Sequence, residues 1–355
     1  MLFYYFLQER IMSDATNNLF SHSPKELTTD GFLTWILYFL NNDEYKNQRQ
    51  IFFDELLLKK SDQKKQVSNI EVRRQVKIKL PNNKKINRAD IILKFKLDGI
   101  DKEILFENKT STTTTYKQLD SYKNGYKNCY RYIYLKLAYI NCQEKELTKS
   151  IGYDTIDIEQ LSNTLQKIKS IHLFVEHYLE YINTTFKKHI FDMADFLQNN
   201  KYAELKSAQF QQFVMCHIFK NEGNKNLDFG RNNGGRPWTN WNICQKNNEY
   251  GNKNEWIFWR IDKTKQGYYI RLDQYANIDK KYKKAKKQRL NELRNIANNI
   301  FKGLGLKTGK MNNKGTKQSK IIIFYFDDSP NTLENMSDFI PKFSAEFCKE
   351  YAKIS

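Results

Sequence analysis

The order of apolar and polar positions predicts that helices and strands alternate in the first half of the chain. Apolar side chains fill most of 32–40, and the preceding stretch 23–26 has Ser at the N-cap, Pro at N1 and Glu at N3 of a helix start. We therefore expect a mostly buried helix there. Residues 72–80 then alternate apolar and polar side chains, as a half-buried strand does, and stop at Pro81-Asn82-Asn83, a turn sequence.

The next elements bring the number of expected strands to four. Residues 88–95 and 103–109 have the pattern of strands, and Leu97-Asp98-Gly99 turns the chain between them, which gives a meander of three strands. Residues 115–128 have the pattern of a helix that follows a Thr-rich cap, and 130–139 that of a fourth strand. The predicted order is α-β-β-β-α-β.

The pattern also divides the chain into two domains. Apolar residues recur at helical spacing from 158 to about 197, so one or two helices should close a first domain at 13–195. The character changes beyond residue 200, and we expect 196–355 to form a C-terminal α+β domain. Its predicted elements are a helix at 207–219, strands at 256–261 and 268–272, a helix that runs from 280–289 to about 301, a flexible basic loop at 303–315 and a buried strand at 321–326.

Composition and charge narrow the classes of partner. A chain of 355 residues with 40% hydrophobic content can bury two cores, so the fold class is mixed α/β with a second domain. Lys and Arg total 59 against 40 Asp and Glu, a formal net charge of +19 that attracts polyanions. Nucleic acid is the first partner to consider. The alternative is that Lys is simply abundant in the proteome that this chain comes from.

Cysteine usage and the first residues bear on the compartment. The five cysteines are far apart, odd in number and without a C-x-x-C pair, so neither a disulfide framework nor a zinc knuckle is expected. This favours a reducing cytoplasm. Residues 1–10 lack a basic n-region and a small-residue cleavage site, and their apolar run is too short to span a bilayer. We therefore expect a soluble cytoplasmic protein without membrane contact.

Acidic and basic side chains on the second and third predicted strands have the types that phosphodiester hydrolysis needs. The reaction requires a Lewis acid on the phosphate, an activated water and neutralisation of developing charge. Asp90 and Glu107 lie on consecutive strands, and carboxylates are ligands for Mg²⁺ or Mn²⁺. Lys109 is two residues from Glu107 and therefore on the same face, where its ammonium group could hold or polarise the attacking water. Asn108 points to the other face, but its backbone carbonyl remains a candidate metal ligand.

The spacing E-x-K is not specific by itself. It occurs at 44–46, 107–109 and 204–206, but only the copy at 107–109 ends an apolar strand and follows a strand that carries an Asp. The helix behind it places Gln118 and Tyr122 at i, i+4, so both side chains can face the strand ends. The alternative is a pair of surface carboxylates with Lys109 as a salt-bridge partner and an ordinary polar helix surface.

These residues together resemble the PD-(D/E)XK nuclease superfamily, in its bacterial branch with E-L-(T/S)-x-D-x-F-L-x-W-L-L and E-N-K motifs. The matching stretches are Lys25-Glu-Leu-Thr-Thr-Asp-Gly-Phe-Leu-Thr-Trp-Ile-Leu37, Arg88-Ala-Asp90-Ile-Ile, Phe106-Glu107-Asn-Lys109 and Gln118-Leu-x-x-Tyr122, within about 20–140. The resemblance implies a restriction-endonuclease-like sheet of four mixed strands flanked by helices. It also implies that Asp90 and Glu107 bind Mg²⁺, that Lys109 assists the nucleophilic water and that Gln118 orients the site.

Two positions depart from the family pattern or leave a choice open. Ala89 stands where the name motif has Pro, which leaves Asp90 in place. Glu26 matches an acidic residue that family members often supply to the metal from the first helix, with Asp30 one turn later as a weaker candidate. A capping box with Ser23 accounts for Glu26 equally well.

Two basic features lie in the second half of the chain. The stretch 230–241 combines glycines with Arg231, Arg236 and two Trp, which suits base stacking and phosphate contacts or, alternatively, a tight turn with buried Trp side chains. The run 280–289 could follow a phosphate backbone or be a solvated helix face. Its candidate contacts are Lys283, Lys284, Lys286 and Lys287.

The prediction is therefore a Mg²⁺-dependent nuclease acting on DNA, most simply an endodeoxyribonuclease, with a role in defence against foreign DNA suggested by the family alone. The alternative function is a module that keeps the nuclease fold and binds nucleic acid or protein without cutting. No zinc-protease motif, Walker loop or G-x-S-x-G elbow occurs in the sequence. RNA as substrate, a homodimer or partner protein, cleavage specificity and an activating effector stay open.

Overall fold

The computed structural model divides the chain into two compact units, each of which is described by itself. The described residues are 18–22, 25–79, 86–199, 208–223, 226–231, 237–247, 254–264, 267–276, 283–301, 318–325 and 332–354. The first unit comprises Met1–Ile140 and Glu144–Phe191, and the second comprises Asn141–Gln143 and Asp192–Ser355. The predicted helix start at Ser23 and Pro24 and the turn at 81–83 lie outside the described residues.

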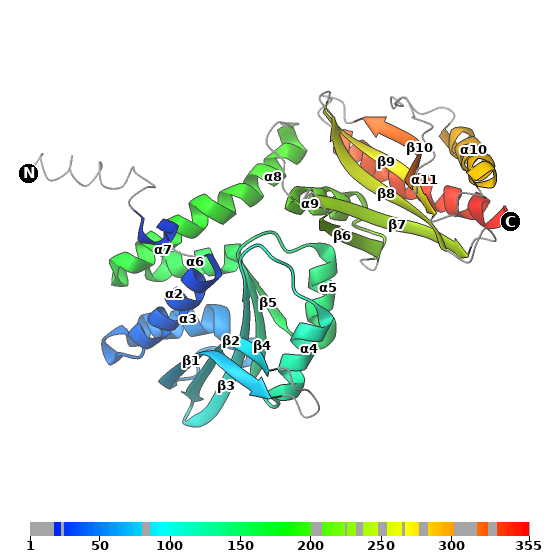
Figure 1. Ribbon diagram of the computed structural model, residues 1–355. Coiled ribbons are helices and arrows are strands. Elements are labelled where there is room, and N and C mark those ends of the chain that lie inside the picture. Colours follow the sequence, from blue (N-terminus) through cyan, green and yellow to red (C-terminus); the bar gives the residue numbers. More distant parts are fainter. Residues whose placement is uncertain are drawn as a thin grey trace, which may run out of the picture. The chain divides into compact units, whose positions relative to one another are not determined.

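A five-stranded mixed sheet forms the centre of the first unit (Figure 1). Its order follows the sequence, with antiparallel pairs among the first three strands and parallel pairs among the last three. The strands are β1 (Val67–Lys79), β2 (Ile86–Leu97), β3 (Ile100–Lys109), β4 (Arg131–Lys136) and β5 (Asp154–Asp157). The prediction of four strands was wrong, because β5 has only four residues and one buried side chain, too short for a pattern of period two.

Helices cover both faces of this sheet (Figure 1). The larger core joins one face to the long helices, through side chains such as Ile36, Phe52, Ile104 and Leu165. A smaller core on the other face joins Leu105 to α4 and α5. The helices of this unit are α2 (Lys25–Phe39), α3 (Lys46–Phe52), α4 (Tyr116–Gly125), α5 (Cys142–Ile151), α6 (Ile158–Ile168) and α7 (Leu173–Ile182). The next helix, α8 (Lys188–Asn199), continues from the first unit into the second at Asp192.

The second unit contains a five-stranded antiparallel sheet in the order β10-β9-β8-β7-β6. Its strands are β6 (Leu227–Arg231), β7 (Pro237–Asn247), β8 (Asn254–Thr264), β9 (Gly267–Ala276) and β10 (Gln318–Tyr325). The helices are α9 (Ala208–Ile218), α10 (Lys283–Phe301) and α11 (Thr332–Lys353). The stretch 230–241 thus contributes the end of β6 and the start of β7, and Trp241 is buried with its ring 4.5 Å from that of Phe219. The predicted loop at 303–315 lies outside the described residues.

Two disulfide bonds contradict the prediction that none would form. Cys142 pairs with Cys216 and Cys244 with Cys348, while Cys129 is a free thiol. No local pattern indicates these pairs, because the partners are 74 and 104 residues apart and only the fold brings them together. Both pairs belong to the second unit. The prediction of a reducing compartment therefore loses its premise.

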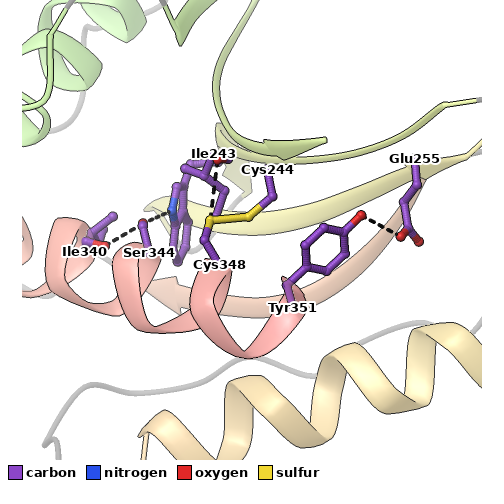
Figure 2. The surroundings of a disulfide bond; sticks show 8 residues. Ile243, Cys244, Glu255, Ile340, Ser344, Cys348 and Tyr351 are labelled. Carbon is purple, nitrogen blue, oxygen red and sulfur yellow. Dashed lines mark hydrogen bonds between the residues drawn. A yellow bond between two sulfur atoms is a disulfide. The ribbon is translucent and has the colours of Figure 1, made fainter. Parts of the chain in front are cut away.

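The second of these bonds fastens α11 to β7 beside a set of polar contacts (Figure 2). The Trp259 Nε1–H group donates to Ser344 Oγ at 2.8 Å, and the Tyr351 hydroxyl donates to Glu255 Oε2 at 2.8 Å. These contacts lie along the same face of α11 as Cys348 and satisfy polar groups that packing has removed from water. Among the described residues, no helix combines the length and apolar character needed to cross a membrane.

Candidate active site

The two carboxyl groups predicted to bind metal meet where β2 separates from β3. The ladder between these strands ends at the pair Ile91–Phe106, so Asp90 and Glu107 are the next residues on each strand. The backbone N–H of Asn108 donates to Asp90 Oδ2 at 2.8 Å, which fixes the Asp90 side chain over the end of β3. The charge of Asp90 acts on Glu107 and raises its pKa, so the two carboxyl groups are neighbours. Two acidic groups therefore lie at this end of the sheet.

Glu107 is completely buried and only half satisfied. Its Oε1 lies 2.6 Å from Lys109 Nζ and accepts a hydrogen bond from Gln118 Nε2 at 2.5 Å. Its Oε2 is buried and has no hydrogen-bond partner in the described part of the chain. Burial, reinforced by the charge of Asp90, raises the pKa of Glu107 to about 8. A buried carboxylate oxygen without a donor is costly unless a cation or a proton satisfies it.

The neighbours of Glu107 respond to the same environment. Burial raises the pKa of Asp90, although the Asn108 N–H and the Lys109 charge oppose the shift. Burial disfavours the charge on Lys109, but Glu107 and Asp90 outweigh it and raise the pKa of that ammonium group. Lys109 is thus a cation at neutral pH, held between two carboxyl groups.

Helix α4 brings Gln118 to the site. Thr115 is the N-cap of this helix, and its side chain accepts from the backbone N–H of Gln118, which positions Gln118 in the first turn. The Gln118 Nε2 group then donates to Glu107 Oε1 and lies 3.2 Å from the Tyr122 hydroxyl. Tyr122, one turn later, is buried, and burial raises the pKa of its hydroxyl group. Gln118 therefore connects the helix to the strand that carries Glu107.

The acidic side chain that α2 buries beside this site is Asp30. Asn108 Nδ2 donates to Asp30 Oδ1 at 2.8 Å, and Gln75 Nε2 lies 3.3 Å from Asp90 Oδ1 and 3.5 Å from Asp30 Oδ2. Burial raises the pKa of Asp30 to about 6. Glu26 is exposed and accepts a hydrogen bond from the Thr112 hydroxyl at 3.1 Å. Asp30, the weaker candidate in the sequence, thus contacts the site through the side chain of Asn108, whereas Glu26 does not.

The carboxylate oxygens at this site are of the type that binds a hard cation, but the site has few carboxylates. Among the described residues, no group of three or more His, Cys, Asp and Glu side chains lies close enough together to hold a metal ion. The fit therefore rests on the two carboxyl groups of Asp90 and Glu107, with the unpartnered Glu107 Oε2 facing no donor. Oxygen ligands from one or two carboxylates, completed by water, are what Mg²⁺ commonly takes.

A second buried cation escaped sequence reasoning. Lys136 on β4 is the register partner of Lys109 on β3, and it is buried. Its Nζ contacts both oxygens of Glu144 at 2.8 and 2.6 Å, and the Tyr134 hydroxyl donates to Glu144 Oε1 at 2.8 Å. Burial lowers the pKa of Lys136 although Glu144 opposes the shift. The available signal was a Lys inside the apolar run 130–139, which a buried partner has to compensate.

The remaining predicted nucleic-acid contacts belong mostly to the second unit. Arg231 is exposed at the end of β6, and Lys284 and Lys287 are exposed on α10. Lys286 is buried and donates to the Ala276 carbonyl at 3.4 Å, so its ammonium group faces the fold and not a phosphate. Arg236 and the side chain of Lys283 lie outside the described residues.

Comparisons with known proteins give little to set beside this geometry. No family model matches the chain, and no curated protein matches it. A solved structure, the MspJI restriction endonuclease in complex with a 27-mer oligonucleotide, is similar at 8% sequence identity and a TM-score of 0.25. The similarity covers 49% of this chain and 40% of that chain. The function therefore has to be argued from the residues of this chain.

Proposed function

We propose that this chain is a metal-dependent nuclease that hydrolyses phosphodiester bonds in DNA, with its catalytic centre at Asp90, Glu107 and Lys109. The observation that carries the proposal is the meeting of two carboxyl groups and one ammonium group at the end of β3. Glu107 is buried within reach of Asp90, and Lys109 Nζ lies 2.6 Å from Glu107 Oε1. Perturbed titratable groups of this kind cluster at functional sites.

The metal would be Mg²⁺, or Mn²⁺ in its place, and its ligands would be Asp90, Glu107 and the backbone carbonyl of Asn108. Glu107 Oε2 supports this assignment because it is buried without a hydrogen-bond donor in the described part of the chain. When bound, the ion supplies a Lewis acid for the phosphate and compensates the buried negative charge. Asp30 serves as a positioning residue, because it holds the side chain of Asn108. Glu26 is exposed and is not needed for this set.

The other side chains have roles that follow from their contacts. Lys109 is a cation beside the carboxyl groups, so it can orient a water molecule and offset charge that develops on the phosphate. Gln118 donates to Glu107 Oε1 and thereby keeps that carboxyl group aimed at Asp90. Tyr122 lies 3.2 Å from Gln118 and extends this contact away from the strand.

The test compares cleavage with binding. Purified protein is incubated with plasmid DNA and with RNA, in Mg²⁺ or in EDTA, beside Asp90→Asn and Lys109→Ala. We expect Mg²⁺-dependent cutting of DNA by the wild type and a loss of roughly 10³-fold or more in both variants, the scale of a positioned acid–base or charge-stabilising group. Circular dichroism confirms that the variants fold. If the wild type binds DNA but never cuts it, the chain is a non-cleaving binding module.

A role in defence against foreign DNA follows only from the family resemblance and is part of the same proposal. Its test is deletion of the gene, which should raise sensitivity to phage. Unchanged sensitivity would remove the basis for that role while leaving the nuclease assignment in place.

A further inference from the structure

Strands β1 and β2 extend beyond the rest of their sheet, next to the candidate site. The pairing of β2 with β3 stops at Ile91, whereas the pairing of β2 with β1 continues to Lys79 and Ile86. Residues 76–79 and 86–89 therefore form a two-stranded arm that begins where the carboxyl groups lie. Because β1 is the first strand in the sheet order, the arm stands at an edge of the sheet (Figure 1).

The two faces of the arm differ in character. Ile78 and Ala89 are buried in the smaller core beside Leu119, and Val76 packs against the same core. Alternation along the strands then sends the side chains of Lys77 and Arg88 to the opposite face. Both are exposed, and they are direct register partners across the two strands.

Lys77 and Arg88 place two like charges opposite each other. Like charges that face each other directly across two strands are destabilising. Two other cations of this sheet are compensated, since Arg73 pairs with Glu71 and Lys94 pairs with Glu103. No ion pair joins Lys77 or Arg88 to a carboxylate in the described part of the chain. A bound anion would remove the repulsion that the fold leaves in place.

The position of Lys77 and Arg88 near the candidate site indicates which kind of anion they would bind. Gln75 lies two residues before Lys77 on β1, Asp90 lies two residues after Arg88 on β2, and Gln75 Nε2 is 3.3 Å from Asp90 Oδ1. A strand rises about 3.3 Å per residue, so the cations lie roughly 7 Å along the arm from Asp90. A chain of phosphates that extends from the candidate site along the arm would therefore pass Asp90 and Glu107 first and then reach Lys77 and Arg88.

We propose that Lys77 and Arg88 form a clamp for a backbone phosphate of DNA, next to the phosphate that is cut. The position of the clamp next to the phosphate that is cut rests on the proposed function, whereas the phosphate contact itself does not. The two side chains are complementary, because a guanidinium group can donate two parallel hydrogen bonds to phosphate oxygens while an ammonium group acts as a point charge. The clamp reads no sequence and fixes the register of the strand over Asp90 and Glu107.

The experiment measures binding apart from cleavage. A fluorescent 20-base-pair DNA duplex is titrated with wild type and with Lys77→Gln/Arg88→Gln over a range of NaCl, with Ca²⁺ in place of Mg²⁺. We expect binding at low salt to weaken by roughly tenfold for each cation removed, as for charge-assisted hydrogen bonds. The slope of log Kd against log salt should fall by about 0.9, since the clamp neutralises one phosphate and each neutralised phosphate contributes about 0.9.

Two matched variants separate a phosphate contact from general charge and from folding. Lys60→Gln/Lys127→Gln removes the same charge from exposed positions near the other end of the sheet and should leave the slope close to that of wild type. Lys77→Arg/Arg88→Lys keeps both charges and should restore most of the binding. The melting temperature of the Gln variant should be unchanged or higher, because the repulsion is gone, whereas a structural role would lower it.

The outcomes distinguish the two proposals. If the wild type cuts DNA but the Gln variant binds with the affinity and salt slope of the Lys60/Lys127 control, the clamp is wrong and the nuclease assignment stands. If the wild type never cuts but its binding depends on Lys77 and Arg88, the nuclease assignment is wrong and the phosphate contact stands. A wild type that neither binds nor cuts overturns both.

Discussion

At the scale of single residues, the proposed chemistry depends on a carboxyl group that water does not reach. Glu107 has no solvent exposure, and Lys109 gives one positive charge for the two carboxyl groups of Glu107 and Asp90. The surplus negative charge has to be neutralised by a proton or by a metal ion. Stability should therefore depend on pH and on divalent cations, independently of any activity.

The pH dependence has a definite sign. In the fold the pKa of Glu107 is about 8, whereas its ordinary value is 4.5, so between these values the folded state holds a proton that the unfolded state has lost. Stability of the metal-free protein should fall as pH rises through this window. Glu107→Gln cannot ionise and should gain roughly 3 kcal/mol relative to wild type between about pH 5 and pH 7.5, measured by urea unfolding in EDTA.

Glu103→Gln is the matched control, because Glu103 lies on the same strand and its pKa is lowered. Its modest burial opposes the charged form, but Lys94 outweighs it. Removing this carboxyl group should give no relative gain as pH rises. A Glu107→Gln profile parallel to that of wild type over the whole window would mean that Glu107 is ionised throughout.

Metal binding should be visible without substrate. At a Mn²⁺ concentration about 100 times its Kd, binding to the folded state alone would stabilise the wild type by about 2.7 kcal/mol and raise the melting temperature by several degrees. Asp90→Asn should lose this rise. Asp101→Asn, which changes an exposed carboxylate at the other end of β3, should keep it. Equal rises in both variants would place the bound Mn²⁺ away from Asp90.

At the scale of elements, the sequence predicted the helices and strands that a local pattern of apolar and polar residues determines. The long alternating strands β1, β2 and β3, the helices α4, α9 and α10, and the strand β10 all occur close to their predicted ranges. The copy of E-x-K at 107–109 lies beside a second carboxyl group, as the local signals of strand length, turn and partner Asp predicted. Adjacent strands then bring Asp90 and Glu107 together without further information.

What local pattern could not show depends on packing between distant segments. The burial of Asp30 requires α2 to lie against the end of β3, where Asn108 holds it, and no spacing within α2 distinguishes Asp30 from Glu26. Strand β5 is too short for a periodic signal. The contact of Lys136 with Glu144 joins a strand to the next helix and is visible only once both are buried.

This ion pair between β4 and α5 gives a prediction of its own. Lys136 and Glu144 are both buried, and Nζ lies 2.6 Å from Glu144 Oε2. Lys136→Met should destabilise the fold by about 3–5 kcal/mol, because it leaves an uncompensated buried carboxylate, whereas Lys136→Met/Glu144→Leu should recover most of that loss. Urea unfolding of the wild type, the two single variants and the double variant measures the coupling. A double variant no more stable than Lys136→Met would show that packing, not charge, holds these elements.

At the scale of the whole molecule, the two units differ in how they are held together. The first unit relies on two apolar cores and carries the free thiol Cys129. Both disulfide bonds join residues of the second unit, but only the Cys244–Cys348 loop of 104 residues lies within it, because the Cys142–Cys216 loop of 74 residues runs through 144–191 of the first unit. Cross-links over loops of this length typically stabilise by about 2–4 kcal/mol each. Reducing agent should therefore weaken the second unit most, while the proposed catalytic residues include no cysteine.

A count of free thiols tests whether the two disulfide bonds form in solution while Cys129 stays free. Unfolded without reductant, the wild type should expose one reactive thiol per chain, that of Cys129, and five after reduction. Cys129→Ser should expose none before reduction, which makes it a matched control for incomplete unfolding. Urea unfolding after reduction should then show the second unit losing stability while DNA cleavage by the first unit persists below that transition.

The same count tests the predicted compartment. Disulfide bonds persist where the surroundings are oxidising and are rare in a reducing cytoplasm. One thiol per chain in protein taken directly from its cells, with new disulfides blocked during lysis, would place the second unit in an oxidising environment. Five thiols would mean that the cysteine pairs stay reduced in the cell. The prediction of a reducing cytoplasm would then again be supported by the state of the cysteines.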